Sequence, residues 1–353
     1  MKINHCLLAA TFFVSTFFVQ AAAWAQGSLT PPGAPAPTMK TADQIEPRTI
    51  VNAVNTPGDA NNLFVITNPG SYYLTTNIVG VSGKNGIGIL GNNITLDLNG
   101  FALQGTAGSL DAINFPFNTT NSNIEIHNGI INGWLGGSGF FARQSLNLLL
   151  EHLNVSSNSS GINNGSVSST VRNCIVSQNS SSGIWCDGGS THITGCTVEN
   201  NGGGILLNGS VADCLLRNNG VGIVCQGGSV TGCTVFGSHS YGIYASGPGC
   251  LIVGNTCIGN NTDNVNNSGG IVIADFAGQC RIENNQLTGN GASGIRIIDI
   301  AFGSGANKNF VIKNTAVGNG VNYIVPGGNV FGPIANDSTG AITNSSPWAN
   351  FSF

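Results

Sequence analysis

Residues 183–233 read GIWCDGGSTHITGCTVENNGGGILLNGSVADCLLRNNGVGIVCQGGSVTGC, and a short unit recurs within this stretch. Each unit opens with a glycine and an isoleucine, at Gly183, Gly204 and Gly222, so the intervals are 21 and 18 residues. A period near 20 residues is typical of a solenoid, in which each repeat forms one coil that stacks on the next. The pair recurs on both sides of this stretch, at Gly161-Ile162, Gly242-Ile243, Gly270-Ile271 and Gly294-Ile295.

Each repeat holds short segments in which apolar and polar residues alternate, separated by glycine, asparagine and serine. This pattern predicts two or three short strands per repeat, each too short to bury an apolar face alone. Stacking the repeats solves this problem because equivalent residues of successive coils form ladders. We therefore predict an all-β chain that folds as a single-stranded right-handed parallel β-helix. The solenoid would hold roughly eleven coils about 4.8 Å apart, with capped ends.

The ladders also explain the cysteines and many of the asparagines. One register holds Cys174, Cys196, Cys214 and Cys233, and inward positions of the Gly-Ile strands hold Cys186 and Cys225. Buried packing is the preferred interpretation of these thiols. Cys250 and Cys280 share a third register and are the best candidate pair for a disulfide. A parallel ladder of amides is predicted for Asn179, Asn201, Asn219, Asn260 and Asn290.

The ends of the chain differ from the repeats in composition. Residues 1–25 have a basic residue, an apolar run and Ala23-Trp24-Ala25, as in a signal peptide. Residues 26–49 are a Pro-rich tether and lead-in, residues 50–335 the β-helix, and residues 336–353 a C-terminal cap. We expect a secreted protein, periplasmic or extracellular, that has no membrane span after cleavage.

The net charge of the chain limits the classes of molecule that it can bind. The chain has 11 basic and 15 acidic side chains, a formal net charge of −4. Nucleic acid is therefore excluded as a partner. An anionic polysaccharide would be repelled unless a metal ion or a local basic patch intervened.

Three stretches together carry a family resemblance: residues 69–74 (PGSYYL), residues 94–101 (ITLDLNGF) and the Gly-Ile coils. They resemble the right-handed parallel β-helix repeat proteins of the pectate-lyase-like superfamily, from about Ile50 to the C-terminus. That superfamily includes polysaccharide lyases, glycoside hydrolases, periplasmic accessory proteins related to copper-enzyme maturation, and members with no assigned role. The resemblance implies the fold and leaves the activity open.

Enzyme motifs of that superfamily are mostly missing. Asn261-Thr262-Asp263 matches the first element of the polygalacturonase pattern, and no later element follows. For a lyase, the candidate catalytic residues are Asp275, Arg296 and Asp299, because the aspartates occupy equivalent positions one coil apart. Ca²⁺ is expected only under this interpretation. The alternative is a pair of solvated turn aspartates.

A row of outward positions follows the isoleucines of the Gly-Ile strands: Phe141, Asn163, Trp185, Leu206, Val224, Tyr244, Val272 and Arg296. Exposed aromatic rings in such a row could stack on sugar rings, unless a loop or the tether covers them. The candidate ligand-binding residues are Phe141, Trp185, Tyr244 and Arg281, of which Arg281 is expected near Asp275 and Asp299 in register.

The histidines give no cluster with metal-ligand spacing, so no metal site is predicted. Two hypotheses remain. The preferred one is a non-enzymatic secreted protein whose outer face binds a polysaccharide or cell-envelope glycan. The alternative is a polysaccharide lyase or glycoside hydrolase with its site around Asp275, Arg296 and Asp299. No cofactor is predicted apart from the conditional Ca²⁺.

Overall fold

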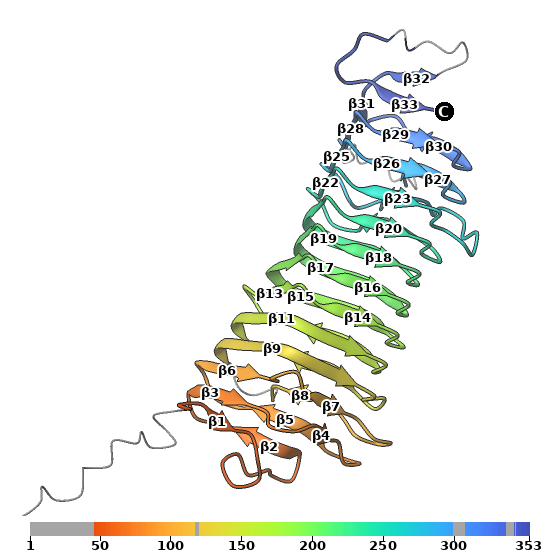
Figure 1. The fold of residues 1–353 in the computed structure, drawn as a ribbon. Helices are drawn as coiled ribbons and strands as arrows, with labels where there is room; N and C mark the ends of the chain where they lie inside the picture. Colours follow the sequence, from red (N-terminus) through yellow and green to blue (C-terminus); the bar gives the residue numbers. More distant parts are fainter. Residues whose placement is uncertain (1–45, 117–119, 299–307, 337–341, 343) are drawn as a thin grey trace, which may run out of the picture. The chain divides into compact units, whose positions relative to one another are not determined.

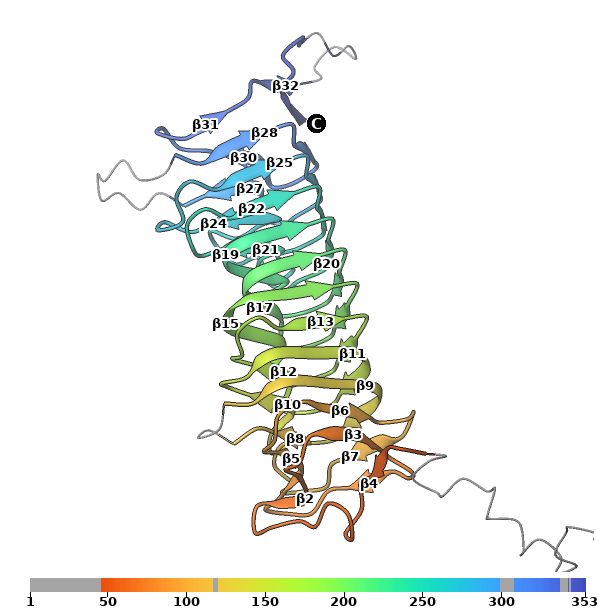
Figure 2. The same cartoon turned by 90° about the vertical axis from the view of Figure 1, so that its left-hand side faces the viewer.

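The computed structural model describes residues 46–116, 120–298, 308–336, 342 and 344–353. Residues 47–353 form a compact unit of their own. Within the described ranges this unit is built from strands and contains no helix, and consequently none that could cross a membrane. The strands wind into coils that stack along one direction, as Figures 1 and 2 show from two sides. The predicted all-β parallel β-helix is confirmed.

Each coil contributes strands to three parallel ladders, here called face 1, face 2 and face 3. Face 1 contains β2 (Asn62–Ile66), β5 (Asn85–Ile89), β8 (Ile113–Asn114), β10 (Ser138–Ala142), β12 (Ser160–Asn164), the first residues of β15 (Ser182–Thr194), β17 (Gly203–Ala212) and β19 (Ile223–Thr231), then β21 (Ile243–Ala245), β24 (Ile271–Ile273), β27 (Ser293–Ile297) and β30 (Val321–Ile324).

Face 2 contains β1 (Thr49–Ile50), β3 (Gly70–Tyr73), β6 (Ile94–Asp97), the first residues of β9 (Ser122–Asn132) and β11 (Leu146–Ser156), β13 (Thr170–Arg172), the last residues of β15, β17 and β19, then β22 (Leu251–Val253), β25 (Arg281–Glu283), β28 (Phe310–Ile312) and β31 (Val330–Phe331).

Face 3 contains β4 (Ile78–Val79), β7 (Ala102–Gln104), the last residues of β9 and β11, β14 (Ile175–Ser177), β16 (Thr197–Glu199), β18 (Leu215–Arg217), β20 (Thr234–Phe236), β23 (Thr256–Ile258), β26 (Gln286–Thr288), β29 (Thr315–Val317), β32 (Ile334–Asn336) and β33 (Asn350–Ser352). β33 lies in the expected cap, yet it pairs in parallel with β29 and so extends this ladder.

The isoleucines of the Gly-Ile pairs form the inner column that the repeat predicts. Ile184 pairs with Ile205, and Ile205 with Ile223, in the same register. The same column continues through Ile243, Ile271 and Ile295, and all of these side chains are buried. Burial of each such side chain stabilises the fold by about 1.5–3 kcal/mol.

Sharp bends between faces 2 and 3 explain why asparagine, aspartate or glycine precedes each cysteine of the first register. Asn173 and Asp213 have φ values of 53° there. The equivalent Gly195 and Gly232 have values of 62° and 63°. Glycine, asparagine and aspartate adopt this left-handed conformation with little strain. The cysteine that follows then points into the core.

The predicted ladders of amides and thiols are confirmed. Asn179 Nδ2 donates to Asn201 Oδ1 at 2.9 Å, and Asn201 Nδ2 donates to Asn219 Oδ1 at 3.1 Å. All nine cysteines of the described residues are buried and free. Cys250 and Cys280 therefore do not form the disulfide for which they were the best candidate pair.

Candidate functional site

The predicted outward row lies on face 1 in the expected register. Phe141 pairs with Asn163, Asn163 with Trp185, and Trp185 with Leu206. The pairing continues through Val224, Tyr244, Val272 and Arg296. Trp185 is 39% exposed, whereas Val272 is fully buried. The expectation of exposure is therefore wrong for Val272.

Trp185 lines a hollow of about 410 Å³ together with Arg143, Asn163, Gly165 and Asp187. This set is called the Trp185 hollow below. Its residues come from the ends of β10 and β12 and from β15. It combines one broad apolar ring with guanidinium, amide and carboxylate groups, the mixture that binds polyhydroxylated molecules.

Farther along face 1, polar and aromatic groups are engaged with neighbours in the protein. The Tyr241 and Tyr244 rings lie 4.7 Å apart between centroids, and burial raises the pKa of Tyr244. Arg296 Nη2 donates to Asn267 Oδ1. Asn267 lies in the segment between β23 and β24, so this bond joins that segment to β27 on face 1.

The lyase candidates are only partly brought together. β24 and β27 are neighbours, with Val272 paired to Arg296, and Asp275 follows β24 in a turn. Asp299 lies outside the described residues. The remaining predicted ligand-binding residue, Arg281, lies on face 2, away from the row.

Arg281 belongs to a separate group on face 2. Its Nη2 atom lies 2.6 Å from Glu283 Oε2, and Lys313 Nζ lies 3.0 Å from Glu283 Oε1. The Lys313 ammonium, followed by the Arg281 guanidinium, holds the pKa of Glu283 below its usual value. The Arg281 guanidinium also lies 5.3 Å from the centroid of the Phe310 ring.

A second polar cluster on face 2 escaped the sequence reasoning. Asp97, His127, Glu151 and Arg172 occupy one ladder position in four successive coils. His127 Nδ1 lies 3.0 Å from Glu125 Oε1, and His127 Nε2 lies 3.7 Å from Asp97 Oδ1. We call Asp97, Glu125, His127, Glu151 and Arg172 the His127 cluster.

The Arg172 guanidinium sets the charge state of one member of this cluster. Arg172 Nε donates to Glu151 Oε2, and this contact holds the pKa of the Glu151 carboxyl below its usual value. The expectation that no histidine joins a cluster of metal-ligating groups is wrong for His127, because one ligand atom each from Glu125, His127 and Glu151 lies within 4.8 Å of the others.

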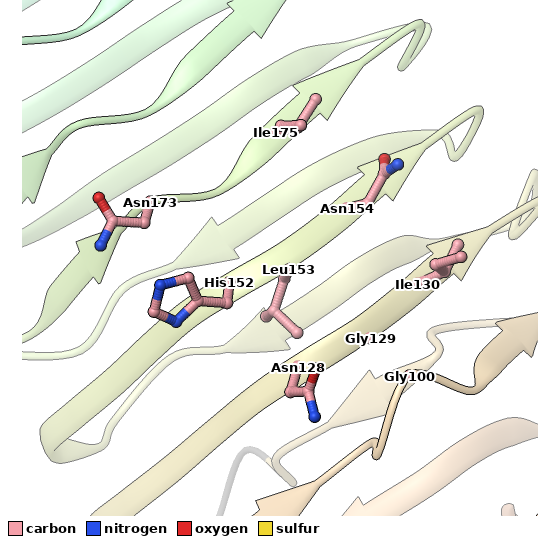
Figure 3. A pocket seen from close by; sticks show the side chains of 9 residues that line it. All are labelled: Gly100, Asn128, Gly129, Ile130, His152, Leu153, Asn154, Asn173 and Ile175. Atoms are coloured by element: carbon pink, nitrogen blue, oxygen red, sulfur yellow. The ribbon is translucent and has the colours of Figure 1, made fainter.

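The corner between faces 2 and 3 beside this cluster is hollowed. The hollow is wide open, has a volume of about 360 Å³, and is lined by Gly100, Asn128, Gly129, Ile130, His152, Leu153, Asn154, Asn173 and Ile175 (Figure 3). The exposed imidazole of His152 has its Nδ1 atom 3.9 Å from Glu151 Oε2. Asn128 Nδ2 donates to Asp97 Oδ1 at 3.1 Å. Both contacts join the hollow to the His127 cluster.

Comparison with known proteins agrees with the fold. The family model described as "right handed beta helix region" matches residues 58–221. By its fold, the chain is a right-handed parallel β-helix protein. The predicted resemblance to pectate-lyase-like β-helix proteins is thereby confirmed for the fold. No curated protein matches this β-helix protein.

Solved structures resemble the β-helix protein in fold. The A-module of the mannuronan C-5 epimerase AlgE4 from Azotobacter vinelandii has a TM-score of 0.62 and 15% identity, covering 81% of this chain and 89% of that one. The AlgE6 A-module from the same organism has a TM-score of 0.56 and 15% identity, covering 81% and 88%. At such identity the similarity shows the fold alone.

Proposed function

We propose that this chain is a secreted β-helix protein that binds a polysaccharide or cell-envelope glycan through face 1, centred on the Trp185 hollow. The observation that carries the proposal is a 39% exposed tryptophan set among polar side chains in a hollow. The proposed role is binding without turnover.

The size of the tryptophan contribution follows from its exposure. With 39% of its surface exposed, Trp185 offers about 100 Å² to a ligand, since an aromatic side chain of this size buries up to about 250 Å². A sugar ring stacked on one side would cover about half of this, or about 50 Å². At about 25 cal/mol per Å², the contact contributes about 1.3 kcal/mol, close to tenfold in affinity.

The aromatic row favours an extended ligand. Phe141 lies two coils from Trp185, and Tyr244 lies three coils away on the other side. At about 4.8 Å per coil, these separations are about 10 and 14 Å. A polymer laid along the stack can reach more than one of these rings, which a single sugar cannot.

The local charge favours a ligand rich in hydroxyl groups. Arg143 and Asp187 contribute one charge of each sign to the Trp185 hollow, and the whole chain has a net charge of −4. Neither balance attracts a polyanion. Secretion rests on the signal-peptide pattern of residues 1–25.

Polysaccharide lyase or glycoside hydrolase activity around Asp275, Arg296 and Asp299 is the alternative proposal. The two solved structures of similar fold bear the name of an enzyme that acts on mannuronan. Against catalysis on this chain, Arg296 is already bonded to Asn267, which ties its guanidinium to the protein.

Affinity electrophoresis in gels containing soluble neutral or acidic polysaccharides tests the proposal. Trp185→Ala should weaken retardation by the binding polysaccharide about tenfold, as estimated above. Trp348→Ala is the matched control because Trp348 is also exposed, at 48%, and lies beside Lys313 away from face 1. Equal loss in both variants, or no retardation by any polymer, would contradict the proposal. Release of unsaturated or reducing products, abolished by Arg296→Ala, would establish the alternative.

A further inference from the structure

The His127 cluster places three metal-ligating groups on one patch of face 2. His127 and Glu151 are directly paired on β9 and β11, and Glu125 precedes His127 by two residues on β9. Residues two apart on a strand point to the same side. Three ligating side chains from two neighbouring strands therefore converge above the ladder.

The distances suit ligands of one small cation. The ligand atoms of Glu125, His127 and Glu151 lie within 4.8 Å of one another, and His127 Nδ1 lies 3.0 Å from Glu125 Oε1. Ligands about 2.0–2.1 Å from a tetrahedral Zn²⁺ ion are about 3.3 Å apart. A cation between these atoms needs only small side-chain shifts.

The surroundings of the imidazole support the same interpretation. With Nδ1 directed at Glu125, the opposite nitrogen Nε2 faces Asp97 Oδ1 at 3.7 Å. A carboxylate beyond the second ring nitrogen is the usual arrangement around a metal-bound histidine, because it fixes the tautomer and the ring orientation. Asp97 is itself held by Arg48 Nη1 at 2.9 Å.

The net charge of the His127 cluster and its neighbours favours a bound cation. The patch has three carboxylates, those of Asp97, Glu125 and Glu151, and two guanidinium groups, with Arg48 paired to Asp97 and Arg172 to Glu151. The patch therefore has one excess negative charge when the imidazole is neutral. Arg172 contacts the Oε2 atom of Glu151.

We propose that Glu125, His127 and Glu151 bind one divalent transition-metal ion such as Zn²⁺, with Asp97 orienting the imidazole. The imidazole ligand favours Zn²⁺ over Ca²⁺ or Mg²⁺, which prefer oxygen ligands. Three protein ligands leave one position of a tetrahedral ion open to solvent. The site lies on face 2 and does not depend on glycan binding by face 1.

Isothermal titration calorimetry with Zn²⁺, on the full chain after treatment with a chelator, tests this site. About one ion per chain should bind saturably. His127→Ala should weaken binding more than about 100-fold, and Asp97→Asn about tenfold. His192→Ala is the matched control, because His192 also points outward from face 2 but contacts Ser210 Oγ through Nδ1 at 2.6 Å. This control should bind zinc like the parent chain.

Two isosteric variants guard against misfolding. Glu125→Gln and Glu151→Gln keep the shape of the side chain, and circular dichroism checks that the sheet is retained. Both should lose at least about tenfold in affinity. The proposal is overturned if the parent chain shows no saturable binding, if His127→Ala binds like the parent, or if His192→Ala loses as much affinity as His127→Ala.

Discussion

Replacing Asn179 with alanine tests the stacking of equivalent residues most sharply. The Asn179 amide is buried between two coils. Its Nδ2 atom donates to Val155 O at 3.2 Å and to Asn201 Oδ1 at 2.9 Å. Its Oδ1 atom accepts from the backbone N of Asn158 at 3.0 Å and from Asn158 Nδ2 at 3.1 Å. The substitution removes all four hydrogen bonds.

The expected cost follows from these contacts. Each buried hydrogen bond contributes about 1 kcal/mol net, and an orphaned buried donor costs about 1–3 kcal/mol. The backbone N–H of Asn158 would become such a donor. We expect Asn179→Ala to lower the free energy of unfolding by about 4 kcal/mol. In contrast, Asn154→Ala should change it by less than about 0.5 kcal/mol, because Asn154 is exposed.

Reversible urea unfolding, followed by far-ultraviolet circular dichroism, measures both variants. The midpoint should fall clearly for Asn179→Ala and stay unchanged for Asn154→Ala. If Asn179→Ala costs less than about 1 kcal/mol, its amide does not join successive coils and the ladder account is refuted.

Three further outcomes follow from the same contacts. Ser238 interrupts the amide ladder, and its buried hydroxyl lacks a hydrogen-bond partner among the described residues. If the new amide pairs with Asn260, Ser238→Asn should raise the free energy of unfolding by about 1–2 kcal/mol. The urea midpoint should rise with it, and a lower midpoint would contradict this. Arg172 lowers the pKa of Glu151, so the ionised carboxylate stabilises the fold above its unfolded pKa of about 4.5, and this contribution is lost as the pH falls below that value. Glu151→Gln should therefore make the fall in stability below about pH 4.5 less steep. An unchanged dependence of stability on pH would count against the pairing of Glu151 with Arg172. The nine described cysteines are buried, and burial raises the pKa of Cys186 to about 12. A thiol reagent should therefore modify these nine thiols only after denaturation. Fast labelling of any of them in the native protein would show that the core is open to the reagent.

The repeat could be predicted from the sequence because its period and its turn residues act locally. Each isoleucine after a glycine points inward, and the next residue points outward, since strand side chains alternate. This rule placed Trp185 and Tyr244 on one face. The rule does not say whether an outward residue is exposed. Val272 is buried, and Arg296 is bonded to Asn267.

The His127 cluster could not be predicted in the same way. Before residue 161 the Gly-Ile pairs, at Gly86-Ile87, Gly88-Ile89 and Gly129-Ile130, do not recur at a regular interval, so the register of these coils could not be counted. Asp97 and His127 are 30 residues apart, and His127 and Glu151 are 24 apart, yet each pair is in register. Turns of different length absorb this difference, and a turn's length says little about which strand residues it aligns.

A crystal structure with the tightest-binding oligosaccharide tests the central claim about function most directly. The account predicts a sugar ring stacked on the Trp185 indole at about 4 Å, with hydroxyl groups bonded to Arg143 or Asp187. A saccharide ordered beside Asp275 and Arg296, or on face 2 or face 3, with the Trp185 ring left uncovered, would contradict it.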